Sequence, residues 1–179
     1  MSFKNVRAGI NPPDDFYTII EIAKDSLPIK YEVNKEFDAL FVDRFLFTAM
    51  SYPENYGYIP QTLSDDGDPL DVLVFAPYPV VSGSVIRSRP VGIMYMEDEH
   101  GIDAKIIAVP HSKLSSLYEG VQSLDDLPSS SLARIQHFFE HYKDIEPEKW
   151  VKFRGWGDLA EAQEEIRKSV AAYEPHEDI

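Results

Sequence analysis

The chain has 179 residues, within the usual size range of one domain, and 44% are hydrophobic, so it can bury a core without disulfide or metal staples. Its 17 basic and 31 acidic residues give a net charge of −14, which argues against a general nucleic-acid-binding surface because phosphate backbones need a basic face. The absence of cysteine excludes disulfides, thiolate metal sites and cysteine catalysis.

No segment of the sequence is typical of a membrane span or a signal peptide. The most apolar stretch, residues 72–81, is broken by two prolines and is far shorter than the ~20 residues that cross a bilayer. Residues 1–16 lack the apolar core of a signal peptide. We therefore expect a cytoplasmic protein with no membrane partner, folded as a single domain over residues 1–179 with a frayed tail from about residue 174.

The first two-thirds of the chain is predicted to be rich in short strands. Runs of aromatic and β-branched residues, each bounded by Pro, Gly, Asn or Asp, occur at residues 16–22, 29–33, 40–42, 72–76, 84–87, 91–96 and 105–109. Many short strands without alternating helices argue against a parallel βαβ sheet. They favour a closed or partly closed antiparallel barrel.

The last third is predicted to be mainly helical. Apolar residues recur at helical spacing over residues 132–142 and again over residues 159–173. Asp158 is placed to cap the second helix, with Glu161 at the position of a capping box. The sequence thus predicts an α+β fold in which helices pack outside a small barrel.

Four carboxylates fall within seven residues in the segment DDGDPLD, residues 65–71. Like charges this close repel one another unless cations neutralise them. A solvated acidic turn is the alternative interpretation, since Asp, Gly and Pro are good turn formers. The segment, however, runs directly into an apolar strand, which places Asp71 on ordered backbone. An EF-hand loop does not fit, because positions 5, 6 and 12 counted from Asp66 are Leu, Asp and Pro.

A second acidic cluster, EDEHGIDAK, covers residues 97–105 between two predicted strands. A solvated hairpin tip is again the alternative. Two acidic clusters at strand ends of one small barrel could together hold more than one hard divalent cation, because Mg²⁺ binds carboxylate, water and phosphate oxygens.

Basic and phenolic side chains flank these acids. Taken singly, each is more often a surface charge or a core tyrosine. In so acidic a chain, however, basic residues beside acid clusters are better candidates for binding an anion. Lys and Arg converging with Mg²⁺ on phosphoryl oxygens is the usual arrangement for phosphoryl transfer. The flanking residues are Lys30, Arg44, Tyr52, Tyr56, Tyr58, Lys105, Tyr142 and Lys143.

The segment HFFEH, residues 137–141, matches the H-x-x-E-H zinc pattern of some metalloproteases. The pattern arises easily by chance in an amphipathic helix, and it leaves both acid clusters unexplained. We therefore interpret His137 and His141 as interfacial or partly buried histidines.

The signature segment DGDPLDV, residues 66–72, resembles that of the soluble family I inorganic pyrophosphatases of the bacterial type. The resemblance extends from about residue 3 to residue 156, through IKYE, FVDRF, YPENYGYIPQTL, GDPLDVLV, GSVIRSRPVG, DAKIIAVP and HFFEHYKD. It implies a five-stranded OB-like antiparallel β-barrel with packed helices. The implied activity is Mg²⁺-dependent hydrolysis of pyrophosphate to two orthophosphates by direct in-line attack of a metal-activated water.

The resemblance also implies a role for each candidate residue. Asp68 would be the general base beside the attacking water, and Asp71 would bridge two of several Mg²⁺ ions. The metal ligands would be Asp66, Asp71, Asp103, Asp98 and Glu32. The phosphate contacts would be Lys30, Arg44, Tyr56, Lys105, Tyr142 and Lys143, of which Arg44, Tyr56 and Lys143 would also act in catalysis. Supporting positions would be Glu21, Tyr52 and Glu99.

Bacterial members of that family are usually homohexamers built from two trimers, which implies an interface role for His137 and His141 instead of zinc binding. Two other functions remain as alternatives. A non-enzymatic module that binds divalent metal or polyphosphate would have no need of Asp68 as a base. A hydrolase of nucleoside triphosphates is disfavoured because the sequence has no P-loop pattern.

Overall fold

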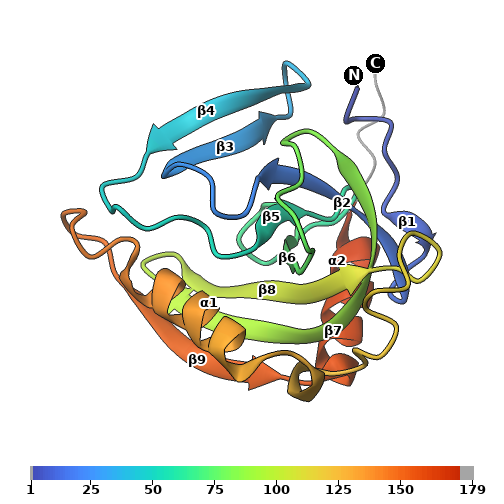
Figure 1. The fold of residues 1–179 in the computed structure, drawn as a ribbon. Coiled ribbons are helices and arrows are strands. Elements are labelled where there is room, and N and C mark those ends of the chain that lie inside the picture. Colours follow the sequence, from blue (N-terminus) through green and yellow to red (C-terminus); the bar gives the residue numbers. More distant parts are fainter. Residues whose placement is uncertain (1, 174–179) are drawn as a thin grey trace.

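The computed structural model describes residues 2–173, in which nine strands, two α-helices and a short 3-10 helix follow one another (Figure 1). The predicted frayed tail lies outside these residues. The strands are β1 (Gly9–Asn11), β2 (Asp15–Ile22), β3 (Ile29–Asn34), β4 (Ala39–Phe45), β5 (Asn55–Tyr58), β6 (Asp71–Val74), β7 (Val85–Asp98), β8 (Gly101–Pro110) and β9 (Val151–Gly157). The helices are η1 (Leu124–Asp126), α1 (Ser129–His141) and α2 (Leu159–Ala172).

Seven strands form one strongly curved sheet in the order β1-β2-β5-β6-β8-β7-β9. Strand β2 pairs with β5 and also with β7, so the sheet curls back on itself and is partly closed. The 14-residue strand β7 makes this possible because different stretches of it pair with different neighbours. Residues 85–88 pair with β2, and residues 93–98 lie between β8 and β9. Strands β3 and β4 form a separate two-stranded hairpin.

The structure corrects the expectation of an antiparallel sheet at one place, because β6 and β8 are parallel. The chain leaves β6, enters β7, and returns along β8, which is antiparallel to β7. Because β7 returns the chain to the end of the sheet at which β6 began, β8 starts at that same end and runs parallel to β6. This pair sets Asp71 directly opposite Lys105.

The strand boundaries also differ from the sequence prediction. The predicted strands at residues 84–87 and 91–96 are parts of β7, which continues through an irregularity between Pro90 and Gly92. Strands β1, β5 and β9 were not predicted. The last third is helical as predicted, but it also contains β9, which adds to the edge of the sheet beside β7.

The two helices cover different faces of the sheet. Alternate residues of one strand point to opposite faces. Accordingly Ile107 of β8 packs in one buried cluster with Phe139 of α1. Its neighbour Ile106 packs in another cluster with Ile166 of α2. The helix α1 therefore lies over the face that carries the aromatic side chains near the candidate site.

The predicted cap of α2 is confirmed. Asp158 Oδ1 accepts a hydrogen bond from the Glu161 N–H at 2.9 Å, and Glu161 Oε2 accepts one from the Asp158 N–H at 2.8 Å. These two contacts satisfy amide groups that the first helical turn leaves unpaired. In residues 2–173, no helix has both the length and the apolar character needed to cross a membrane.

Candidate functional site

The parallel pair β6–β8 brings one basic and two acidic predicted residues together. Asp71 begins β6 opposite Lys105 of β8. Asp103 lies two residues before Lys105, so both side chains project from the same face of β8. Asp66 approaches from the loop before β6, which Gly67 turns with a φ of +88°. Neither the parallel pairing nor its register was evident from the sequence.

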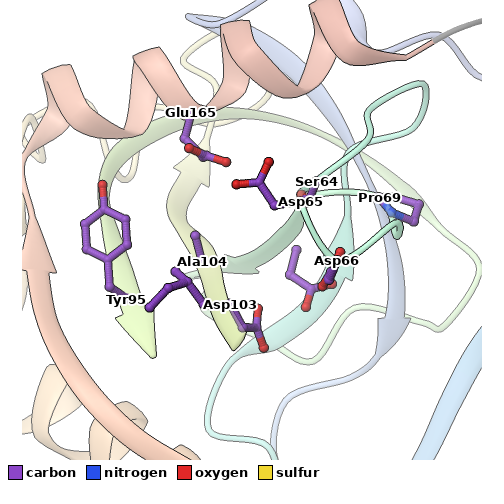
Figure 2. Close-up of a pocket in the computed structure, with 10 residues that line it drawn as sticks. Ser64, Asp65, Asp66, Pro69, Tyr95, Asp103, Ala104 and Glu165 are labelled. Carbon is purple, nitrogen blue, oxygen red and sulfur yellow. The ribbon is translucent and has the colours of Figure 1, made fainter. Parts of the chain in front are cut away.

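The acidic side chains line two neighbouring hollows. A small cavity of about 60 Å³ is lined by Asp65, Asp66, Asp71, Asp103 and Glu165, among others. Figure 2 shows Glu165 reaching this cavity from the helix α2, while Asp66 and Asp103 lie at the other end. A larger cleft of about 860 Å³ shares Asp66 and Asp71 with the small cavity. Other predicted residues on its wall are Glu21, Lys30, Glu32, Tyr56 and Asp68.

Lys105 is the positive charge at the centre of the acids, and its side chain is only 3% exposed. Its Nζ donates to Asp71 Oδ2 at 2.6 Å and to the two Asp103 oxygens at 3.1 and 3.0 Å. Burial by itself would lower the pKa of Lys105, but the charges of Asp103 and Asp71 outweigh burial and raise that pKa well above its usual value. Lys105 is therefore a buried ammonium that stays charged.

One ammonium does not offset the negative charge of all the acids in this cavity. Burial raises the pKa of Asp103 despite the neighbouring Lys105, and burial also raises the pKa of Asp66. Hard carboxylate oxygens in a cavity short of positive charge fit a hard divalent cation. In their present positions, no three acidic or histidine side chains in residues 2–173 are arranged to hold one ion. Asp71 and Asp103 are both engaged by Lys105 instead.

Two tyrosines from the segment around β5 pack beside Lys105. The Tyr56 hydroxyl donates to Asp71 Oδ2 at 2.6 Å, and the Tyr52 ring lies 5.1 Å from the Tyr56 ring. Burial raises the pKa of both hydroxyls well above the usual value, so both remain protonated donors. Tyr142, which ends α1, is also buried and has a raised pKa for the same reason.

The hairpin β3–β4 supplies two cations. Lys30 and Arg44 lie directly opposite each other in its register, an arrangement that is unfavourable unless an anion lies nearby. In this structure the anions are carboxylates. Lys30 Nζ is 3.2 Å from Asp43 and 3.4 Å from Glu32, while Arg44 Nη1 is 3.1 Å from Glu146.

Lys143, two residues after the end of α1, also pairs with carboxylates. Its Nζ is 2.9 Å from Asp98 and 3.9 Å from Glu99, which lie in the second acidic cluster. Each of the four predicted phosphate-contacting cations thus pairs with carboxylates in the described part of the chain. An anionic ligand would have to displace these carboxylates or bind through the donors that they leave free.

The remaining predicted residues differ in burial. The Asp68 side chain is 71% exposed at the cleft, 3.5 Å from Lys35 Nζ. Glu21 is buried, and its Oε1 accepts a hydrogen bond from the Val33 N–H at 2.7 Å. Burial raises the pKa of Glu21 to about 8. Arg44, Asp98, Glu99 and Lys143 do not line the two hollows described above.

The paired histidines lie on the exposed side of α1, away from this site. The His137 and His141 rings are 4.6 Å apart, and His141 Nδ1 is 2.7 Å from Asp144 Oδ2.

Two acidic residues that approach the site from distant parts of the sequence were not predicted. The helical pattern of apolar residues places Glu165 on the exposed face of its helix. Only the packing of α2 in the fold brings this residue to the small cavity. Glu146 follows α1 in a turn, 102 residues from its partner Arg44. Nothing in the local pattern separates either residue from an ordinary surface charge.

Comparisons with known proteins show the family to which the chain belongs. A family model described as inorganic pyrophosphatase matches residues 18–174. The chain is 65% identical to inorganic pyrophosphatase 2 of Pseudomonas syringae over 97% of this chain and 96% of that relative. It is 58% identical to the inorganic pyrophosphatase of Escherichia coli over 97% of each chain.

Solved structures give the same result. The structure of an inorganic pyrophosphatase from Coxiella burnetii matches with a TM-score of 0.91 and 51% identity, covering 94% of this chain and 100% of that one. These similarities extend over nearly the whole chain at identities far above those at which only the fold is shared. The chain belongs to the inorganic pyrophosphatase family.

Proposed function

We propose that this chain hydrolyses pyrophosphate to two orthophosphates with Mg²⁺ as its cofactor. One observation carries the proposal: a cavity of carboxylates short of positive charge, formed by Asp66, Asp71 and Asp103, adjoins a larger cleft walled by Lys30 and Tyr56. Hard acids suit a divalent cation, and the cations and phenol suit phosphate oxygens. The family membership supports the same reaction.

The residues that would hold Mg²⁺ are Asp66, Asp71 and Asp103, with Asp98 and Glu32 for further ions. Bound Mg²⁺ would neutralise the charge of pyrophosphate and lower the pKa of a coordinated water from 15.7 toward ~7. The amount and order of loading would depend on Lys105, because its ammonium now engages two of the three central ligands.

The chain's own groups would perform the remaining steps. Asp68, exposed at the cleft, would accept the proton of the water that attacks one phosphorus in line. Lys30 and Lys143 would exchange their carboxylate partners for phosphate oxygens, and Arg44 would bind phosphate oxygens through guanidinium donors that Glu146 leaves free. Tyr56, Tyr142 and Lys105 would donate hydrogen bonds from buried positions. Glu21, Tyr52 and Glu99 would support these groups. No covalent intermediate is needed.

The test is phosphate release from pyrophosphate, with and without Mg²⁺, by the parent protein and by Asp68→Asn. We expect Mg²⁺-dependent release by the parent and a kcat lowered at least about a hundredfold in the variant, as loss of a general base predicts. Asp125→Asn, an exposed aspartate of η1, is the matched control and should stay near the parent rate. A near-parental rate in Asp68→Asn would remove Asp68 from the role of base.

The same assay separates the alternative functions. A module that only binds divalent metal or polyphosphate would bind pyrophosphate without releasing phosphate. A nucleoside triphosphate hydrolase would release phosphate faster from ATP than from pyrophosphate.

We extend the proposal to the fold and the assembly. The pairing circuit β2-β5-β6-β8-β7-β2 supports a five-stranded OB-like barrel in a single domain. A cytoplasmic homohexamer of two trimers, with His137 and His141 at a contact between trimers, follows from the family resemblance and from the exposed position of both histidines.

A further inference from the structure

Glu146 is a buried carboxylate in the turn between α1 and β9. Its side chain is only 8% exposed. Its backbone N–H donates to the Lys143 carbonyl oxygen at 2.9 Å, which forms a turn directly after a predicted phosphate-binding residue. The turn holds the carboxylate inward. The Glu146 side chain is therefore not free to move into solvent.

The Glu146 carboxylate lies between two cations. Its Oε2 is 3.1 Å from Arg44 Nη1 and 2.9 Å from Lys149 Nζ. Its Oε1 is buried without a hydrogen-bond partner in residues 2–173, and so is Arg44 Nε. The pair is only partly buried, since the Arg44 side chain is 27% exposed, and the nearest carboxylate to Arg44 Nε, that of Asp43, is 3.9 Å away. A pair that leaves buried polar atoms without hydrogen bonds on both partners stabilises a fold poorly, because the desolvation of those atoms is not recovered. The role of this salt bridge is therefore something other than stabilising the fold.

The position of Arg44 in the fold supplies that reason. Arg44 lies on the β3–β4 hairpin, which forms a sheet of its own (Figure 1). In residues 2–173 this hairpin pairs with no strand of the seven-stranded sheet, and a side chain, the Glu21 carboxylate of β2, joins the two by accepting the Val33 N–H of β3. The orientation of its guanidinium relative to α1 must therefore come from side-chain contacts. Glu146 provides one, since it belongs to the segment that follows α1. Arg44 is near enough to Tyr52 and Tyr142 that its charge acts to lower the pKa of both hydroxyls.

We propose that Glu146 is a positioning residue that holds the Arg44 guanidinium in place for a phosphoryl group of the substrate. Of the Arg44 donors, Glu146 accepts only from Nη1 in residues 2–173, so the Nη2 donors of the guanidinium remain for the anion. The salt bridge also ties the cation pair of the hairpin, Lys30 and Arg44, to the end of α1 that carries Lys143. This inference rests on the proposed function, in which Arg44 contacts phosphate.

Simple electrostatics gives the opposite expectation. A carboxylate beside an anion site repels the anion, so its removal should tighten pyrophosphate binding and lower KM. If Glu146 positions Arg44, its removal should raise KM, because a loose guanidinium must be ordered when substrate binds. The sign of the change in KM therefore distinguishes the two roles.

The experiment compares KM and kcat for Mg²⁺-dependent pyrophosphate hydrolysis in Glu146→Gln, Glu146→Asp, Arg44→Met and the double variant Glu146→Gln with Arg44→Met. We expect Glu146→Gln to raise KM about tenfold, comparable to weakening one charge-assisted hydrogen bond, with kcat changed less than about threefold. Glu146→Asp keeps the charge and should recover part of the loss. The matched control is Glu148→Gln, an exposed glutamate of the same turn, which should leave both constants unchanged.

The double variant tests whether Glu146 acts through Arg44. Once Arg44 is gone, Glu146→Gln should raise KM no further, whereas a general effect on the fold would raise it in both backgrounds. An unchanged or lowered KM in Glu146→Gln, or full additivity, overturns the inference. If Glu146→Gln does not fold, Glu146→Asp with and without Arg44 gives the same comparison. A parent protein that does not hydrolyse pyrophosphate would refute the proposed function itself, whereas an active parent with an unaltered variant refutes only the role of Glu146.

Discussion

The buried Glu21 carboxyl allows a quantitative prediction about stability. Its pKa is raised from the ordinary 4.5 to about 8, chiefly by burial. Below pH ~4.5 Glu21 is neutral in both the folded and the unfolded chain, and folding carries no ionisation penalty. As the pH rises toward ~8, this group ionises in the unfolded chain but stays protonated in the folded chain. Ionisation thus stabilises the unfolded chain alone, and the free energy of unfolding falls progressively.

Glu21→Gln removes this titration while keeping an oxygen that can accept the Val33 N–H. Each pH unit between the two pKa values changes the free energy of unfolding by about 1.4 kcal/mol. Relative to the parent, we therefore expect the variant to be equally stable near pH 4, more stable by about 3 kcal/mol at pH 7, and by about 5 kcal/mol at pH 9.

The assay is urea unfolding followed by the fluorescence of the two tryptophans, at one protein concentration and with a chelator present to exclude divalent cations. Glu36→Gln, an exposed glutamate in the hairpin turn, is the control and should differ from the parent by less than about 0.5 kcal/mol at every pH. A difference for Glu21→Gln that stays below about 1 kcal/mol from pH 4 to pH 9 would show that the carboxyl is not desolvated as argued.

Three further predictions concern packing, metal affinity and assembly. Gly57→Ala places a Cβ against the Ile19 backbone of β2 and should destabilise the fold by about 3 kcal/mol or more, while Gly120→Ala, where the added Cβ meets open space, should cost less than about 0.5 kcal/mol in urea unfolding. Lys105→Met frees Asp71 and Asp103 from the ammonium that now engages them, so titration calorimetry should show that the variant binds Mg²⁺ about tenfold more tightly than the parent. Lys168→Met, at an exposed lysine, is the control and should change the Mg²⁺ affinity far less. Equal Mg²⁺ affinities of the parent and Lys105→Met would mean that Lys105 does not compete with the metal. His137→Ala and His141→Ala should weaken assembly more than catalysis, and light scattering that detects intact assemblies at low protein concentration would contradict the interface role.

The sequence by itself determined the features that depend on neighbouring residues. The capping box of Asp158 and Glu161 was predicted because its two hydrogen bonds span only three residues. The acidic segment before β6 was recognised because its four carboxylates are close in the sequence, so they repel one another in any fold. The helical spacing of apolar residues identified both α-helices. Runs of aromatic and β-branched residues identified six of the nine strands in residues 2–173, although two predicted strands proved to be one.

Only the tertiary structure decided which distant residues meet. Strand β5 was missed because its Gly57 suggests a turn, whereas in the fold it lets the β2 backbone approach closely. The contact of Lys105 with Asp71 depends on a parallel pairing that no local pattern specifies. The salt bridge of Arg44 and Glu146 joins a hairpin to the end of a helix 102 residues later. Such contacts follow from how the whole chain buries its apolar faces, and that is a property of all its elements together.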